Sequence, residues 1–306
     1  AVLSVEIRDI IIPKELQGVM SLEAQAECRK NARITLMEAE RDVSAILQEV
    51  AETYSHDEIA LSLRKIHLVY EGMQDNGSSL VVPSAYSEGF TLDPADYFDA
   101  QRLVVIANPN AQTGVELPQA AIEAIVQRNA GSVVVVDEAY VAFGGESALP
   151  LTKKYPNVLV VRTFSKSRSL AGARLGFAVG SAELIDDLRR LKFSTNPYSV
   201  NRCALAAGVA AVKDCAYYEA NCARIAQERE RFAAALRQRG WYLTDSKANF
   251  VLAKPVAGSA PDIAAKLKER GILVRYLGGE LSEYLRITIG TAGQMDALLA
   301  ALDEIA

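Results

Sequence analysis

The sequence feature that most constrains the fold is an apolar strand that runs into a polar turn holding one lysine. Residues 158–161 (VLVV) form the expected strand, and the turn after it contains Ser165 and Lys166. Arg174 follows eight residues after the lysine and precedes a second apolar run at 175–179. Ligands of open α/β sheets bind beyond the carboxyl ends of the strands, so we expect Lys166 to face a ligand pocket.

The side chains of this turn suggest a particular kind of ligand. An amine that is shielded from water beside another cation has a lowered pKa and can attack a carbonyl group. Ser165 and Arg174 are a hydroxyl and a guanidinium of the kind that hold a phosphate. Together the three groups suggest a phosphorylated aldehyde held by Lys166, which is pyridoxal 5'-phosphate (PLP). A Ser-Lys pair by itself fits an ordinary surface lysine better.

A second strand ends in residues that suit the same cofactor. Four valines at 133–136 are followed by Asp137, Glu138, Ala139 and Tyr140. The carboxylate of Asp137 can pair with the pyridinium nitrogen, which keeps the ring an effective electron sink. Tyr140 can donate to the phenolic oxygen of the ring. The alternative for Asp137 is a cap of the turn or helix after the strand.

A third strand, at residues 103–107, leads into a loop at 108–114 (NPNAQTG) that contains Asn110. Alone, this loop predicts only a turn. The ordered set of three strands, each followed by its polar loop, is much more specific than any one of them. It favours an α/β fold whose ligand groups lie beyond the carboxyl ends of the strands.

From about Thr91 to the C-terminus, the chain resembles the fold-type I PLP-dependent aminotransferases, and the histidinol-phosphate aminotransferases most closely. The resemblance implies that Lys166 is the Schiff-base lysine. It implies site roles for eight residues in all, which are Lys166, Asp137, Tyr140, Asn110, Ser165, Arg174, Arg286 and Asn249.

Within this resemblance, Asp137 and Tyr140 contact the ring nitrogen and the phenolic oxygen, and Ser165 and Arg174 bind the phosphate. The remaining roles concern the substrate and the asparagine loop. Arg286, in YLRITIGT at 284–291, matches the arginine that grips the amino-acid carboxylate with two hydrogen bonds, and Asn249 matches a substrate-side position. Asn110 would lie against the ring, in a loop where Gln112 replaces the usual proline.

The resemblance also implies an activity and its partners. It implies amino transfer between glutamate or 2-oxoglutarate and the pair imidazole-acetol phosphate and histidinol phosphate, a step of histidine biosynthesis. The small-molecule partners would be amino acids and keto acids. A homodimer or a higher oligomer is expected.

The first 90 residues differ in character. Residues 2–12 alternate like a half-buried strand, and residues 14–50 are rich in helix formers. Leu36, Val43 and Val50 recur every seven residues. This spacing fits either a short coiled-coil seam or one amphipathic helix packed on its own domain.

This segment resembles a second family. Residues 4–17 (SVEIRDIIIPKELQ), 39–42 (AERD) and 81–90 (VVPSAYSEGF) are similar to the last strand, helix and tail of stomatin-like (slipin) proteins of the SPFH/band 7 superfamily. Members of that family are membrane-attached scaffolds that oligomerise, but the membrane hairpin would lie upstream, so no membrane contact is expected here. The resemblance implies a fusion, natural or produced by assembly of the sequence, with the join between Phe90 and Asp93.

The two resemblances lead to two functional hypotheses. The aminotransferase part would lack the N-terminal loop that binds the cofactor phosphate through a helix N-terminus, and also the ring that stacks on the pyridine. We therefore expect weak or absent PLP binding and an impaired enzyme, because rates depend steeply on positioning. The alternative is a stomatin-like oligomerising scaffold segment joined to a catalytically silent aminotransferase remnant.

Composition narrows the remaining classes. A net charge of −5 and a pI near 5.3 give no reason to expect nucleic acid. Residues 1–90 hold 8 Lys/Arg against 15 Asp/Glu and the rest 25 against 23, which agrees with a boundary. With two histidines and no Cys-x-x-Cys pair, no zinc site is expected, and the four cysteines are interpreted as free core thiols in a reducing cytoplasm. No apolar run suits a membrane span and the N-terminus is no signal peptide.

The expected domain order follows from these assignments. We expect a mainly helical N-terminal segment at 1–90, a partial PLP-binding large domain at 91–205, and a long helix with a small α/β domain at 206–306. Helices are expected at the ranges 118–129, 182–191, 200–239 (as two helices), 261–270 and 292–305. Strands of the small domain are expected at 241–243, 250–253, 272–275 and 285–289.

Overall fold

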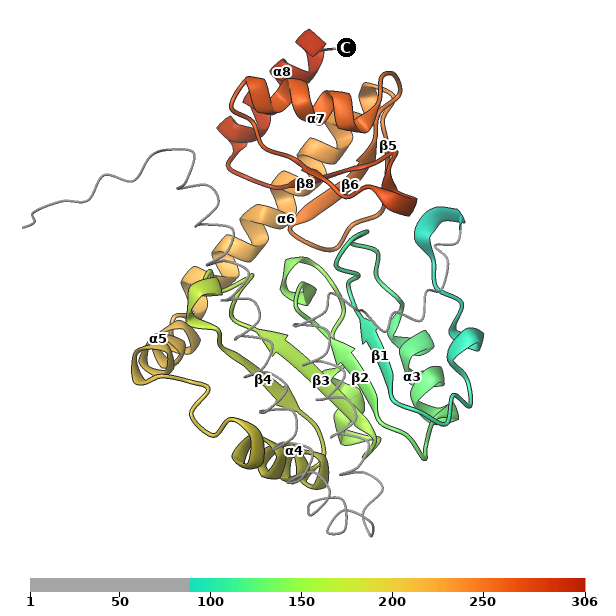
Figure 1. Cartoon of the computed structure of the whole chain (residues 1–306), viewed down its shortest axis with the longest axis vertical. Coiled ribbons are helices and arrows are strands. Elements are labelled where there is room, and N and C mark those ends of the chain that lie inside the picture. The colour runs from blue at the N-terminus through green and yellow to red at the C-terminus, as the bar shows by residue number, and fades with distance from the viewer. Residues whose placement is uncertain (1–87, 306) are drawn as a thin grey trace, which may run out of the picture. The chain divides into compact units, whose positions relative to one another are not determined.

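The computed structural model of this chain describes residues 88–305 and contains two four-stranded sheets in that range (Figure 1). The first sheet has the order β1 (Val104–Ala107), β2 (Val134–Asp137), β3 (Val158–Thr163) and β4 (Gly176–Val179). Strands β1, β2 and β3 are parallel, whereas β4 is antiparallel to β3. The expected α/β fold is therefore present, and the parallel sheet ends in one antiparallel strand.

One face of the first sheet is buried under α3 (Gln119–Arg128). The strands β1 and β2 follow a period of two, since Val104 and Ile106 are buried while Val105 between them is 58% exposed. The helix contributes Ile122, Ile125 and Val126 to the same core, and all three are fully buried. The 3-10 helices η2 (Pro94–Tyr97) and η4 (Leu149–Lys153) pack their apolar side chains around this core.

The second sheet is antiparallel throughout, with the order β5 (Tyr242–Leu243), β6 (Phe250–Lys254), β8 (Leu285–Thr288) and β7 (Arg275–Tyr276). It packs with α7 (Ala260–Glu269) and α8 (Ala292–Ile305) in one hydrophobic core. Ser259 starts α7, where its hydroxyl accepts a hydrogen bond from the Asp262 N–H and Pro261 occupies the first turn.

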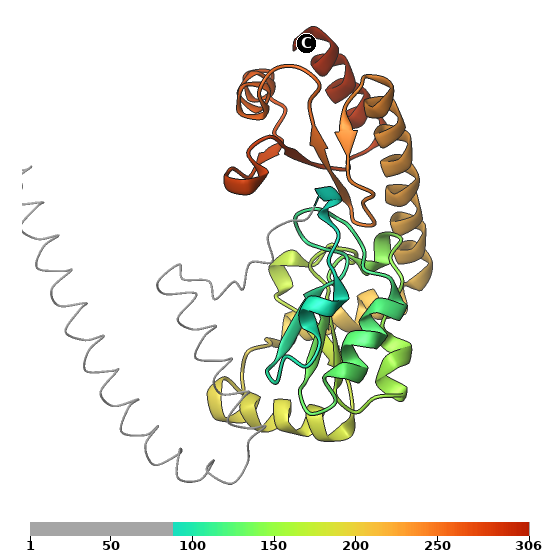
Figure 2. The ribbon, with the colours of Figure 1, turned by 90° about the vertical axis from the view of Figure 1, so that its right-hand side faces the viewer.

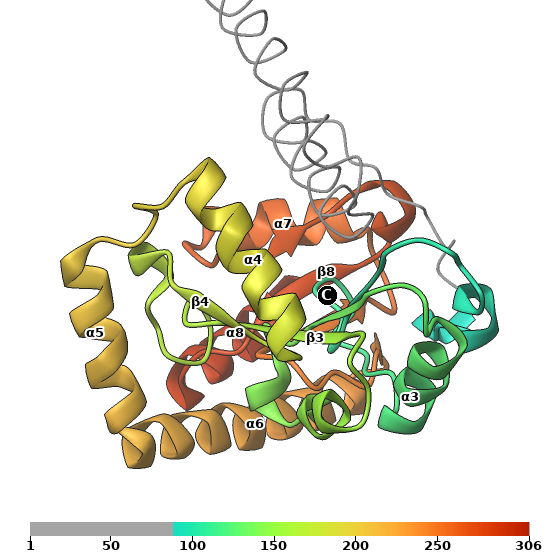
Figure 3. The ribbon, with the colours of Figure 1, turned by 90° about the horizontal axis from the view of Figure 1, so that it is seen from below.

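Three helices connect the two sheets, namely α4 (Ala182–Thr195), α5 (Arg202–Lys213) and α6 (Cys215–Gln238). Asn201 caps the start of α5, and Asp214 ends α5 and caps α6. Figure 3 shows the change of direction between these two helices.

Helix α6 contacts both halves of the described chain. Its 24 residues give it a length of about 36 Å, and it passes from the first sheet to the second (Figure 2). It contacts η3 (Val141–Phe143), which follows β2, and also β5, β6 and α8. A small separate core lies at this junction and contains Tyr140, Phe143, Cys222, Ala248 and Phe250.

Several expectations about local structure need correction. The strand expected at 272–275 is the shorter β7, and α4 extends to Thr195. Cys222 is a buried core thiol as expected, but Cys203 and Cys215 are exposed, because they lie on the outward faces of α5 and at the start of α6. The expectations for residues 1–87, including the stomatin-like strand and helix and Cys28, lie outside the described residues. None of the helices in residues 88–305 has both the length and the apolar character that crossing a membrane requires.

Candidate active site

The register of the first sheet brings three polar loops together. Ala107, Asp137 and Val161 are neighbours across β1, β2 and β3, so the loops after these strands leave the same edge of the sheet. The backbone continues the ladder beyond the strands, since the Asn108 N–H donates to the Asp137 carbonyl at 2.9 Å and the Glu138 N–H to the Val161 carbonyl at 2.8 Å. The asparagine loop, the Asp-Glu-Ala-Tyr segment and the lysine turn thus meet where the sequence predicted a ligand site.

Lys166 lies over the ring of Tyr140. Its Nζ is 5.3 Å from the ring centroid, within the range of a cation–π contact. Lys166 is exposed and Tyr140 is buried, so the ammonium group lies on the solvent side of the packed Tyr140 ring. Tyr140 is held by Phe250, whose ring meets it edge-on at 5.3 Å between centroids.

Asp137 is the last residue of β2 and is half-buried. Its Oδ1 accepts a hydrogen bond from the Ala139 N–H at 3.0 Å. Burial raises the pKa of the Asp137 carboxyl above its usual value, and the bond from Ala139 opposes this shift only in part. A carboxylate in this state gains from a cationic partner such as a protonated ring nitrogen. The cap-like bond to Ala139 shows that the alternative role also contributes.

The asparagine loop is organised by its own side chains. The Oδ1 atom of Asn110 accepts from the Gln112 N–H, the Thr113 N–H and the Thr113 hydroxyl, at 3.0, 3.0 and 3.1 Å. Gln112 therefore uses a backbone N–H that a proline at this position would not have. The Asn108–Pro109 peptide is cis.

Arg286, on β8, reaches this loop from the second sheet. Its Nη1 donates to the Ala111 carbonyl at 2.8 Å, and its guanidinium carbon lies 4.8 Å from the centroid of the Phe250 ring. Its Nε is buried and has no hydrogen-bond partner among residues 88–305. A bidentate grip on a carboxylate needs two parallel N–H groups, and the Nε edge of this arginine can supply them. Asn249, just before β6, is half-buried and its carbonyl accepts from the Ile289 N–H at 2.9 Å.

Ser165 and Arg174 are arranged differently from the other predicted residues. Ser165 is half-buried, and its N–H donates to the Thr163 hydroxyl at 3.0 Å. Arg174 is exposed, has a left-handed backbone with φ of 51°, and donates from Nη1 to the Ala171 carbonyl at 3.0 Å. Within residues 88–305, Arg174 forms no hydrogen bond or ion pair with the other predicted site side chains.

The structure thus connects Lys166, Tyr140, Phe250 and Arg286 in one series of side-chain contacts, with the Asn110 loop at its far end. Phe250 is the central member of the series, although the sequence analysis gave it no role. A hydrophobic residue that starts a buried strand carries no signal of such a contact, since its neighbours come from other parts of the chain.

Comparison with known protein families gives one match that covers most of the chain. The profile of the family "Aminotransferase class I and II" matches residues 56–302. The chain belongs to this family. The match begins 35 residues before the start of the resemblance seen in the sequence, inside the segment compared with stomatin-like proteins, and the comparisons give no support to a stomatin-like part.

Two curated relatives of this chain are both named histidinol-phosphate aminotransferase. The chain is 48% identical over 220 residues to histidinol-phosphate aminotransferase 1 of Hydrogenovibrio crunogenus, and 46% identical over 217 residues to histidinol-phosphate aminotransferase 2 of Rhizobium meliloti. These alignments cover 72% and 71% of this chain and 62% of each relative. The chain therefore spans a little over three-fifths of the length of these relatives.

Solved structures give the same family. Histidinol-phosphate aminotransferase from Sinorhizobium meliloti, solved in complex with pyridoxal-5'-phosphate, has a TM-score of 0.58 and 30% identity, covering 66% of this chain and 57% of that one. Its bound group is the cofactor that the sequence predicted. The histidinol-phosphate aminotransferase from Clostridium acetobutylicum has a TM-score of 0.69 over 77% of this chain and 74% of that one, and at 24% identity it supports the fold alone.

Proposed function

We propose that this chain is a PLP-dependent transaminase of the histidinol-phosphate aminotransferase type. It would move an amino group between glutamate or 2-oxoglutarate and the pair imidazole-acetol phosphate and histidinol phosphate. The observation that carries the proposal is the contact series from Lys166 through Tyr140 and Phe250 to Arg286. In a chain of the aminotransferase family, this series runs from the amine of the lysine turn to the guanidinium on β8 that would bind the substrate carboxylate.

The residues present on this side of the site fit the cofactor. The half-buried Asp137 carboxylate, whose pKa is raised, would bind the protonated nitrogen of the cofactor ring. Tyr140 and Asn110 would contact the ring and Ser165 would bind the phosphate. Arg174 would reach the phosphate only by giving up its hydrogen bond to the Ala171 carbonyl. When bound, PLP supplies an electron sink that stabilises negative charge on the carbon next to the transferred nitrogen.

Two side chains would act directly on the substrate. Arg286 would bind the substrate carboxylate through its buried Nε edge while Nη1 stays on the Ala111 carbonyl, so that the guanidinium is oriented before the substrate arrives. The Nζ of Lys166 would take the proton from the substrate carbon that carries the amino group, as a general base, and would give it back as a general acid. Asn249 would lie beside the substrate.

We also propose that the chain forms a homodimer through α5. Leu205, Val209 and Val212 repeat at helical spacing on α5 and are 56%, 49% and 50% exposed. An apolar stripe of this kind is typical of a protein–protein contact surface. The family match from residue 56 onward favours the aminotransferase over the scaffold alternative.

The test is covalent capture of the cofactor. The purified chain is incubated with PLP, reduced with borohydride and mapped by mass spectrometry, beside Lys166→Ala and the exposed-lysine control Lys153→Ala. Reduction traps even a weakly bound cofactor, so we expect cofactor on Lys166 at partial occupancy in the wild type and in the control, and none in Lys166→Ala. Capture spread over surface lysines without preference for Lys166 would contradict the proposed function.

A further inference from the structure

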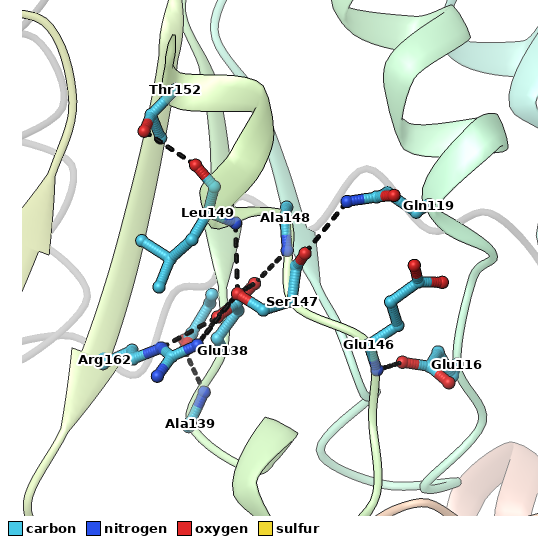
Figure 4. A network of polar contacts seen from close by, with 11 residues as sticks. Glu116, Gln119, Glu138, Ala139, Glu146, Ser147, Ala148, Leu149, Thr152 and Arg162 are labelled. Carbon is cyan, nitrogen blue, oxygen red and sulfur yellow. Dashed lines mark hydrogen bonds and ion pairs between the residues drawn. The ribbon is translucent and has the colours of Figure 1, made fainter.

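The carboxylate of Glu138, the residue after Asp137, is the most completely bonded acid in this region (Figure 4). Its side chain is 1% exposed. It accepts from the Ser147 hydroxyl at 3.0 and 2.9 Å, from the Ala148 N–H at 2.5 Å and from Arg162 Nε at 2.9 Å, and it forms an ion pair with Arg162 Nη2 at 2.8 Å. A buried charge is stable only when it is paired and bonded in this way.

The partners of Glu138 come from the elements that carry the proposed site. Arg162 lies on β3, four residues before Lys166, while Glu138 directly follows Asp137 at the end of β2. The ion pair therefore joins the two strand ends from which the ring-nitrogen partner and the lysine turn extend. Ser147 adds a third anchor, because its hydroxyl also accepts from Arg162 Nη2 at 2.8 Å and from the Leu149 N–H at 3.1 Å.

Helix α3 is tied to the same network. Gln119 in the first turn of α3 donates to the Ser147 carbonyl at 3.1 Å, and the Glu116 carboxylate accepts from the Glu146 N–H (Figure 4). The segment that holds the Glu138 carboxylate is thus fixed to the helix that buries the first sheet. The network is anchored to the core and not only to neighbouring loops.

The close packing of the core is interrupted beside these strand ends. A cavity borders Glu138, Arg162 and Thr163 on one side, together with Ser167 and Arg168 of the lysine turn. Side chains that line a cavity lack contacts on that side, so their positions depend more on directed bonds. The ion pair supplies such bonds where the close packing of the core ends.

We propose that Glu138 and Arg162 are positioning residues, whose ion pair sets the placement of Asp137 relative to the Lys166 turn. Glu138 directly follows β2, and its carboxylate is taken up by Ser147, Ala148 and Arg162, so it would act on Asp137 through the backbone. This inference rests on the proposed function, because it concerns the geometry of that same site. Misplacement of reacting groups by about 1 Å reduces rates by about 100-fold.

The experiment uses the cofactor-free full chain, so that its result does not depend on PLP binding. Lysines are acetylated competitively with acetic anhydride across a pH series, and the labelling of Lys166 is compared with that of Lys192 and Lys153 as internal references. The variants are Glu138→Gln, Arg162→Met and Arg162→Lys. The matched control is Glu123→Gln, which breaks the exposed pair of Glu123 with Lys154.

We expect Glu138→Gln and Arg162→Met to change the relative labelling of Lys166 by about threefold or more and to shift its pH profile, because the lysine turn moves relative to Tyr140 and Asp137. Arg162→Lys is expected to restore part of the wild-type profile, and Glu123→Gln to leave it unchanged. A network that serves stability alone would lower the melting temperature and leave the Lys166 pH profile in place.

A folded Glu138→Gln chain with the wild-type Lys166 profile would overturn the inference. If Glu138→Gln does not fold, Ser147→Ala and Arg162→Lys are measured in its place, since each weakens the network and keeps part of it. Wild-type Lys166 profiles in both variants would also overturn the inference. PLP capture by borohydride reduction is measured on the same variants. Absence of capture in the wild type would defeat the proposed function, whereas the labelling result would still decide the inference.

Discussion

Arg229 on α6 allows a quantitative test of how the two halves of the described chain are joined. Its side chain is 5% exposed, and its Nη1 donates to the carbonyls of Phe143 at 2.7 Å and Ala248 at 2.8 Å. Phe143 belongs to η3, which follows Tyr140, and Ala248 lies just before Asn249 and Phe250. The Arg229 guanidinium therefore connects the segment after Tyr140, which contacts Lys166, with the segment before Phe250, which contacts Arg286.

The cost of Arg229→Met can be worked from these bonds. Methionine keeps the length and the apolar stem of the side chain but leaves two buried carbonyls without their donor, at about 1–3 kcal/mol each. Removing a buried charge returns part of this loss, because the only acidic partner of Arg229 in residues 88–305 is Glu230, which is 60% exposed. We expect a net loss of about 2–4 kcal/mol in the free energy of unfolding.

The assay is urea unfolding followed by circular dichroism, with Arg231→Met as the matched control. Arg231 lies on the same helix, and its ion pairs with Glu228 and Asp296 are more exposed, so its loss should cost about 1 kcal/mol or less. A loss below about 0.5 kcal/mol for Arg229→Met, or equal losses for both variants, would refute the reasoning, because the two buried carbonyl bonds would then contribute nothing measurable.

Three further predictions follow from the site and from α5. Because burial raises the folded-state pKa of Asp137, its ionisation lowers stability as pH rises. Asp137→Asn should therefore unfold at a higher temperature than the wild type at pH 7 and at the same temperature near pH 3. A gain in unfolding temperature that persists at pH 3 would argue against this cause. Arg286→Lys should weaken capture of dicarboxylate substrates by about tenfold or more in a binding titration, since a lysine lacks the paired N–H groups, while unfolding changes little; unchanged affinity would remove Arg286 from the site. Val209→Glu should shift the chain toward monomer in sedimentation, with Ala210→Glu, an exposed position on another face of the same helix, as the control, and an unaltered dimer would exclude α5 as its interface.

Much of the local structure could be predicted because it depends on neighbours in the sequence. The four valines before Asp137 mark β2, and the two helices expected at 200–239 are α5 and α6, with bounds that differ from expectation by only a few residues. The exposed Cys203 and Cys215 show the limit of this reasoning, since a residue type prefers the core on average but the helix face decides each case.

The site could be predicted in its residue types but not in its connections. Lys166, Asp137, Tyr140 and Arg286 were found from strand ends and from family likeness, and their roles remain proposals. Arg174 is the residue for which the geometry departs most from its predicted role, because its guanidinium turns to the Ala171 carbonyl. A side chain of an exposed turn has several directions open to it, and the sequence does not select among them.

The sequence alone determined which elements form and which chemical groups stand at the ends of the strands. The tertiary structure decided which of those groups meet. Arg229 and Phe143 are 86 residues apart, and Arg286 and Ala111 are 175 apart. Contacts over such separations follow from strand register and from the packing of α6 against both sheets, which depend on the whole chain. The same holds for Glu138, whose carboxylate is an ordinary acid in the sequence and a buried, fully bonded anchor in the fold.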